Sequence, residues 1–140
     1  MISEKTFDEI SEGDSAHFEV VITETLVDAF GALSGDCNPL HMDQSYGTQT
    51  SFNGRIAHGM IAGTLFSRLV GMHLPGKYNL YLSQTLSFKK PLHIGARVIV
   101  EGNVLKKSHA VRTLTLSTTV RDATNDEELV VGEALVRVLK

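Results

Sequence analysis

Residues 55–72 read RIAHGMIAGTLFSRLVGM, and apolar side chains stand at almost every position of this stretch. A helix without a polar face is buried on most of its sides, so the pattern predicts a central buried helix over residues 55–72. Small residues recur at every fourth position, as Gly59, Gly63, Ser67 and Gly71. Interior glycine costs about 1 kcal/mol relative to alanine. The stripe therefore indicates that a sheet, a partner helix or a ligand approaches the helix backbone closely.

The residues that follow this helix read as strands. Apolar and polar residues alternate in stretches such as 98–101 and 114–117, and we expect strands over residues 78–89, 97–105, 111–121 and 129–139. Their short connections favour antiparallel neighbours. A further strand is expected over residues 16–23, before the helix. We therefore predict a single α+β domain over residues 1–140, in which an antiparallel sheet of about five strands wraps around the buried helix.

Composition limits the classes of function. A chain of 140 residues with 42% hydrophobic residues fits one globular domain. The net charge of -3 argues against nucleic acid as the main partner, because tracking phosphates needs a basic surface. No stretch is long and apolar enough to span a bilayer, and the first residues lack the apolar core of a signal peptide. The only cysteine, Cys37, cannot form an internal disulfide, so we expect a cytoplasmic location and no membrane partner.

An acid and a histidine stand five positions apart in the segment SGDCNPLH, residues 34–41. A helix is predicted over residues 23–34, and Pro39 then disfavours helical geometry at Asn38. We therefore expect Asp36 and His41 on an irregular loop that runs from residue 36 to residue 54, shaped by side-chain-to-backbone hydrogen bonds of Asn38. A carboxylate and an imidazole on one stiff loop can hold a water molecule between them, which suits general acid–base chemistry.

Gly59 is the second candidate for chemistry. It lies near the predicted start of the central helix, where backbone N–H groups have no intrahelical acceptor. Such a group can donate to a carbonyl oxygen that becomes negative during a reaction. The alternative interpretation is that Gly59 only permits tight packing.

Two other chemistries remain open from the residues alone. Cys37 adjoins the acid, which allows a nucleophile, although nothing nearby is arranged to make a thiolate. A metal site could be built from Asp36, His41, Asp43 and His58, but no compact ligand spacing such as H-x-x-x-H is present. We therefore expect neither a metal nor another cofactor.

Taken together, these motifs resemble the MaoC-like (R)-specific enoyl-CoA hydratases. The runs that carry the resemblance are DCNPLHMD (36–43), RIAHGM (55–60), LFS (65–67), LPG (74–76), YLSQTLSFK (81–89) and GEA (132–134). The resemblance implies a hot-dog fold, which is a curved antiparallel sheet around a central helix. It also implies a homodimer or a higher oligomer. The implied activity is that of a hydro-lyase that adds water reversibly and syn to short- or medium-chain trans-2-enoyl-CoA.

The resemblance also assigns roles to residues. Asp36 is implied to activate the water and return a proton to C2, His41 to bind and orient the same water, and the Gly59 N–H to polarise the thioester carbonyl. Supporting roles fall to Ser67, expected to hydrogen-bond to the Asp36 loop, and to His58, expected to order that loop. Leu65, Phe66 and Leu69 are expected to line the acyl pocket, and Lys77, Lys89 and Lys90 are candidates for contact with CoA phosphates. We also expect an apolar pocket around Asp36.

Coenzyme A is here part of the substrate. The resemblance places the reaction in fatty-acid metabolism, with supply of polyhydroxyalkanoate precursors as one use. Three alternatives remain: a dehydratase for 3-hydroxyacyl groups on acyl-carrier protein, a hot-dog thioesterase, and a non-catalytic acyl-CoA-binding module. The first would use the same residues. The thioesterase is disfavoured because the acid and the histidine precede the central helix, and a mere binding module has no need of both Asp36 and His41.

Overall fold

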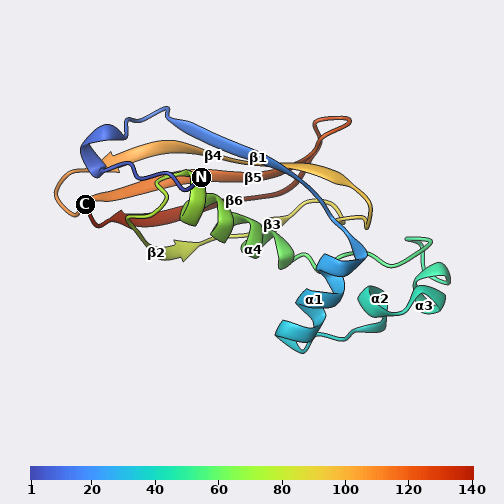
Figure 1. The fold of residues 1–140 in the computed structure, drawn as a ribbon. Helices are drawn as coiled ribbons and strands as arrows, with labels where there is room; N and C mark the ends of the chain where they lie inside the picture. The colour runs from blue at the N-terminus through green and yellow to red at the C-terminus, as the bar shows by residue number, and fades with distance from the viewer.

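Six strands form one antiparallel sheet in the computed structural model, which describes residues 1–140 (Figure 1). They are β1 (Ser15–Val21), β2 (Asn79–Gln84), β3 (Ser87–Phe88), β4 (Arg97–Ser108), β5 (Thr113–Asp122) and β6 (Glu128–Val138). Their order is β1-β4-β5-β6-β2, and the short β3 also pairs with β6. The predicted α+β architecture, a helix packed against an antiparallel sheet, is confirmed. The stretch predicted as one strand over residues 78–89 is divided into β2 and β3, so the sheet has six strands instead of five.

One face of this sheet is buried because apolar residues alternate along its strands. In β4, Val98, Val100 and Val104 are buried, and the partner strand β5 buries Leu116 and Val120. The register pairs Val100 with Val120 and Val104 with Leu116, so these side chains form rows across the sheet. The rows face the central helix, and a short 3₁₀ turn, Phe7–Glu9, adds Phe7 to the core near the N-terminus.

The central helix is shorter than predicted. α4 spans Ile61–Arg68 and continues as a π-helical segment, Leu69–His73. The six residues before it are not helical, because two of them bond to the connection between β3 and β4. Ile56 forms a β-bridge with His93, and the Ala57 N–H donates to the Leu92 carbonyl at 2.8 Å. The prediction of helix from residue 55 is therefore wrong.

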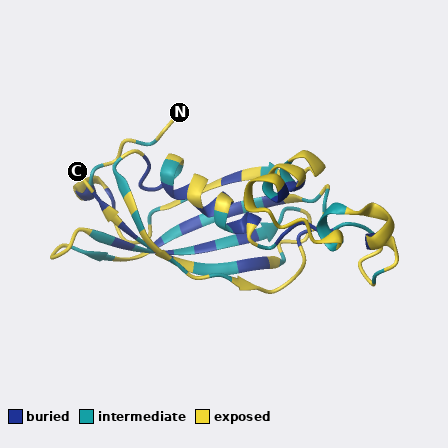
Figure 2. Cartoon of the chain, turned by 90° about the horizontal axis from the view of Figure 1, so that it is seen from below, coloured by how far each residue is buried: buried dark blue, intermediate teal, exposed yellow.

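The helix also has an exposed face, contrary to the expectation that it is buried on most sides (Figure 2). Its sheet-facing residues are buried, whereas Thr64, Ser67 and Arg68 face outward. The outward face includes the small-residue stripe: a Cβ at Gly71 would meet no atom within 4 Å, and one at Gly63 would meet only Leu86 at 3.8 Å. Neither α4 nor any other helix of the structure is long and apolar enough to cross a membrane.

Between β1 and α4 the chain leaves the sheet and builds three helices at one end of the molecule (Figure 1). The first, α1 (Glu24–Ser34), begins as predicted, because the Thr23 side chain accepts a hydrogen bond from the Leu26 N–H. It ends at Gly35, whose φ of 77° is the left-handed geometry of a helix C-cap.

The segment predicted as an irregular loop over residues 36–54 contains two short helices, α2 (Pro39–Met42) and α3 (Gln44–Thr48). Pro39 is the first residue of α2, where its missing N–H is not needed. The Asn38 side chain caps this helix by accepting from the Leu40 N–H at 3.0 Å. The proline therefore starts a helix that carries His41, where we had expected it to prevent one.

Candidate active site

The predicted acid and histidine meet at the end of the sheet where α1, α2 and residues 55–60 come together. One carboxylate oxygen of Asp36 and one ring nitrogen each of His41 and His58 lie within 4.8 Å of one another. A water molecule that makes two hydrogen bonds of about 2.8 Å spans such a gap. The structure thus brings Asp36 and His41 close enough to share one water.

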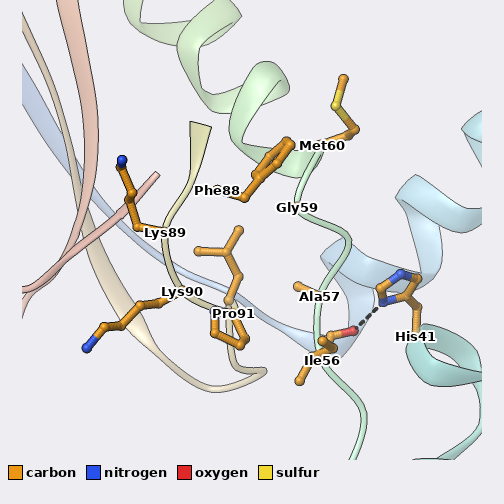
Figure 3. Close-up of a pocket in the computed structure, with 10 residues that line it drawn as sticks. His41, Ile56, Ala57, Gly59, Met60, Phe88, Lys89, Lys90 and Pro91 are labelled. Atoms are coloured by element: carbon orange, nitrogen blue, oxygen red, sulfur yellow. Dashed lines mark hydrogen bonds between the residues drawn. The ribbon is translucent and has the colours of Figure 1, made fainter. Parts of the chain in front are cut away.

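The ring of His41 is held in one orientation. Its Nδ1 lies 2.8 Å from the Ile56 carbonyl oxygen (Figure 3). A carbonyl oxygen only accepts, so Nδ1 carries the hydrogen and donates it. The other ring nitrogen, Nε2, therefore carries the lone pair and can accept a hydrogen bond from a water.

His58 connects the loop of the acid to the segment before α4. Its side chain is only 2% exposed, and its Nε2 donates to the backbone carbonyl of Asp36 at 2.8 Å. The ring packs between those of His41 and Phe30, with centroid distances of 4.1 and 4.8 Å. The nitrogen that faces Asp36 is committed to a backbone carbonyl. This bond ties the Asp36 loop to the segment before α4, and the role of His58 in ordering that loop, without proton transfer, stays a prediction.

Asp36 itself is exposed, so this chain does not supply the apolar pocket that we expected around it. Local hydrogen bonds fix its position instead. Its carboxylate accepts from the Asn38 N–H at 3.2 Å, and its own N–H donates to the Ser34 side chain at 3.1 Å. The carboxylate is therefore placed by the turn that ends α1 and begins α2.

Gly59 presents a free backbone N–H. Residues 58–60 lie before the first turn of α4, and the Gly59 N–H donates no hydrogen bond within the chain. The Phe88 ring lies against this glycine: a Cβ placed on Gly59 would come within 2.9 Å of the ring (Figure 3). A side chain here would require the Phe88 ring to shift, whereas glycine leaves the ring in place and its N–H available to a ligand carbonyl.

A pocket of about 420 Å³ opens beside this glycine (Figure 3). It is lined by His41, Ile56, Ala57, Gly59, Met60, Phe88, Lys89, Lys90, Pro91 and Leu92. One wall comes from the segment before α4 and the other from the chain after β3. The two lysine side chains point away from His41 in the close-up, toward the opposite side of the pocket. The pocket therefore runs from the His41 imidazole, across apolar side chains, to two cations, and Asp36 is not among its lining residues.

Three residues predicted to bind the acyl chain lie elsewhere. Leu65, Phe66 and Leu69 are buried in the core between α4 and the sheet, and none lines the pocket. The large apolar side chains face the sheet because the opposite face of the helix carries the small and polar residues. These three residues do not line this pocket, and their role in binding the acyl chain stays a prediction.

Two further expectations are not met within the chain. Ser67 is exposed on α4 and makes no hydrogen bond to the Asp36 loop, whose bonds go to Ser34 and His58. Lys77 lies outside the pocket and pairs with Glu4 at 3.0 Å. Asp43, considered as a metal ligand, caps α3 by accepting from the Tyr46 N–H, so it is not part of the cluster of Asp36, His41 and His58.

Sequence reasoning missed Phe88 and Arg55. Phe88 covers Gly59 from a strand far along the chain, and no local pattern reveals that contact. Arg55 donates from Nε to the His41 carbonyl at 2.5 Å and from Nη2 to Asp28 at 2.5 Å. The only signal for it was a charge at the start of an otherwise apolar run, which we read as a helix start.

Comparison with known proteins gives consistent matches. The model of the MaoC like domain family matches residues 8–126. An (R)-specific enoyl-CoA hydratase from Aeromonas caviae is 44% identical over 115 residues, which cover 80% of this chain and 83% of the relative.

Solved structures agree with these sequence matches. The unliganded R-hydratase PhaJ1 from Pseudomonas aeruginosa aligns with a TM-score of 0.92 at 36% identity, covering 96% of this chain and 86% of that one. An (R)-hydratase from A. caviae, described as involved in PHA biosynthesis, aligns with a TM-score of 0.88 at 38% identity and covers 92% of this chain and 97% of that one.

Proposed function

The chain belongs to the MaoC-like domain family, and from this premise we propose that it is an (R)-specific enoyl-CoA hydratase, a hydro-lyase. The reaction is the reversible syn addition of water to a short- or medium-chain trans-2-enoyl-CoA, which gives an (R)-3-hydroxyacyl-CoA. One observation carries the proposal. The chain places an acid–histidine pair that can share a water next to a pocket wall with an unused backbone N–H.

The water lies between Asp36 and His41 in this mechanism. It donates one hydrogen bond to the His41 Nε2 lone pair and the other to the Asp36 carboxylate. Asp36 takes the second proton while the water oxygen forms a bond to C3 of the substrate, and the electrons of the double bond move to the thioester oxygen. Because one water delivers its oxygen and its proton from the same side, both add to one face of the alkene.

The negative charge that develops on the thioester oxygen is stabilised by the Gly59 N–H. A donor that is already in position needs no reorganisation when the charge appears, so it lowers the barrier. The protonated Asp36 then returns its proton to C2, the enolate collapses to the thioester, and Asp36 is again a carboxylate. Atoms balance without a metal or redox partner, and accordingly we propose no cofactor.

The cations of the pocket support coenzyme A as the acyl handle. Lys90 is paired with Glu127, whereas Lys89 has no ion-pair partner within the chain. Both lie on the side of the pocket away from His41, where the phosphates of a long handle would emerge if the thioester carbonyl meets Gly59. An unpaired lysine at that place favours a ligand with phosphate groups.

Hydration of crotonyl-CoA, followed as loss of enoyl absorbance, tests this function. We expect saturable turnover that yields the (R)-3-hydroxy product and that is unchanged by dialysis against EDTA. Crotonyl-acyl-carrier protein in the same assay is expected to have a kcat/KM at least tenfold lower. A preference for the carrier protein would favour the dehydratase alternative, loss of activity with EDTA would favour a metal at Asp36, His41 and His58, and no turnover would favour a binding module.

A homodimer is part of the proposal, and the two edges of the sheet indicate where it forms. The β1 edge carries the ion pair of Glu19 with Arg97, and such charges discourage pairing with another sheet. The β2 edge, Asn79–Gln84, has no charged residue and exposes Leu80 and Leu82. An uncharged edge strand with exposed apolar side chains is a surface that pairs with a second copy.

Substitution of one residue on each edge tests the dimer. Leu82 is 47% exposed on β2 and Val21 is 44% exposed on β1, so the two positions are matched in exposure. In sedimentation velocity the wild type is expected at twice the 15.3 kDa chain mass. Leu82→Lys is expected to shift the population toward the single chain, because it places a charge at the interface, and Val21→Lys is expected to leave it unchanged. A dimer disrupted by Val21→Lys alone would place the interface at β1.

The proposal includes the setting of the reaction. We propose a cytoplasmic enzyme, in keeping with the single cysteine. Its product has the (R) configuration at C3. The description of the similar A. caviae structure as involved in PHA biosynthesis supports supply of polyhydroxyalkanoate precursors as one use of this product.

A further inference from the structure

Arg55 lies between α1 and α2 with its side chain only 11% exposed. Its guanidinium makes two hydrogen bonds in different directions. Nη2 donates to the Asp28 carboxylate on α1 at 2.5 Å, and Nε donates to the backbone carbonyl of His41 at 2.5 Å. Asp28 is 56% exposed, so the ion pair sits at the edge of the protein while the bond to His41 lies inside.

The bond from Arg55 to His41 supplies a donor to a backbone carbonyl that has no hydrogen-bond donor within α2. α2 has four residues, so the carbonyls of its last turn receive no hydrogen bond from within the helix. The chain from residue 55 onward takes two of them: Arg55 Nε bonds the His41 carbonyl, and the Ile56 N–H donates to the Leu40 carbonyl at 3.3 Å. The Ile56 carbonyl in turn accepts from His41 Nδ1.

Residues 40–41 and 55–56 are thus joined by three hydrogen bonds, two of which act on the same histidine. One fixes the ring through Nδ1, and the other fixes the backbone that carries the ring. If the backbone rotated, the Nδ1–H would lose its carbonyl, and Nε2 would no longer have a fixed direction. The ring bond alone therefore does not define the direction of Nε2.

We propose that Arg55 is a positioning residue that sets the direction of the His41 lone pair, an inference that rests on the proposed hydratase function for its catalytic consequence. It acts through His41 and touches neither water nor substrate. Its planar guanidinium holds two acceptors at a fixed angle, which a lysine ammonium on a flexible stem does not reproduce. Burial of most of this cation is costly unless its hydrogen bonds are made, and here they anchor α2 to α1.

The test compares Arg55→Met and Arg55→Lys with Arg97→Met, a control that removes an arginine from an exposed 3.7 Å ion pair on the sheet. With crotonyl-CoA, Arg55→Met is expected to lower kcat about 10- to 100-fold with KM changed less than threefold, because small misplacements of catalytic groups have effects of this size. Arg55→Lys is expected to recover only part of the loss, and Arg97→Met is expected to match the wild type.

A second measurement does not depend on substrate. Long-range ¹H–¹⁵N correlation of the imidazole reports the tautomer of His41, which is expected to be Nδ1–H in the wild type and a mixture in Arg55→Met. Wild-type kcat and a pure Nδ1–H tautomer in folded Arg55→Met would overturn the proposal. If Arg55→Met does not fold, the same two results in Arg55→Lys would overturn it. Absence of any hydratase activity in the wild type would count against the proposed function, and the tautomer would still decide the role of Arg55.

Discussion

Asp36→Asn is expected to lower kcat for crotonyl-CoA hydration by about 10³-fold and to leave the protein folded. General acid–base groups contribute about 10²- to 10⁴-fold, and Asp36 both takes and returns a proton in the proposed mechanism. An asparagine amide can do neither. The fold is expected to survive, because the carboxylate is exposed and an asparagine oxygen can still accept from the Asn38 N–H.

His41→Gln is expected to act on the same step with a smaller loss, about 10²-fold. Glutamine can donate to the Ile56 carbonyl as His41 does, but it holds no lone pair in the fixed place of Nε2. Together the two variants separate proton transfer from orientation of the water.

Asp43→Asn provides the matched control for these measurements. It removes a carboxylate from the same segment, where Asp43 only caps α3, and asparagine caps a helix equally well. Its kcat is expected within twofold of the wild type. Hydratase activity retained in folded Asp36→Asn would exclude Asp36 as the base. A collapse of kcat in Asp43→Asn would show that the assay reports the fold of this segment and not the chemistry.

Gly59→Ala is expected to lower kcat/KM by about 10²-fold. The new Cβ would lie 2.9 Å from the Phe88 ring, so either the ring moves into the pocket or the thioester is displaced from the Gly59 N–H. Loss of a comparable donor costs about 2.7–4 kcal/mol of barrier. Phe88 is half exposed and free to move, so the melting temperature is expected to change by only a few degrees.

Gly63→Ala is the control, one helical turn farther along the same stripe. A Cβ there would meet Leu86 at 3.8 Å, which is an ordinary contact, so kcat/KM is expected to stay at the wild-type value. The free energy of unfolding is expected to rise by up to about 1 kcal/mol, because alanine replaces glycine inside the helix. Gly59→Ala combined with Phe88→Ala is expected to recover part of the activity, because the second change removes the clash. Equal kcat/KM in Gly59→Ala and the wild type would show that the substrate carbonyl does not need close approach to a residue without a side chain here.

The sheet was predictable from the sequence because its signals are local. Strand alternation and short connections each depend on a few neighbouring residues, and the antiparallel sheet that they predict is confirmed. The helix boundary at residue 61 was not predictable in this way. Residues 56 and 57 prefer to bond to residues 92 and 93, which are remote in sequence, and that pairing replaces the first turns of the expected helix.

Pro39 illustrates an error of a different kind. Proline is unfavourable inside a helix and favourable at its first position, and only the side-chain cap of Asn38 decides between the two. Leu65 and Phe66 show the same limit, because an apolar helix residue can face a sheet or a ligand equally well, and both face the sheet here. The orientation of α4 relative to the sheet settles this, and it is a property of the whole fold.

The segment from Arg55 to Gly59 contributes both to holding the water and to binding the thioester carbonyl in the proposed mechanism. It holds His41 through residues 55 and 56 and the Asp36 loop through His58, and in the proposed mechanism it binds the substrate carbonyl through Gly59. The opposite wall of the pocket comes from residues 88–92, which have no part in the proposed proton transfers. Substrate range and reaction type are therefore encoded in separate parts of the chain. Substitutions in residues 88–92 can retune which acyl thioester is accepted, and the hydration step can persist unaltered while they accumulate.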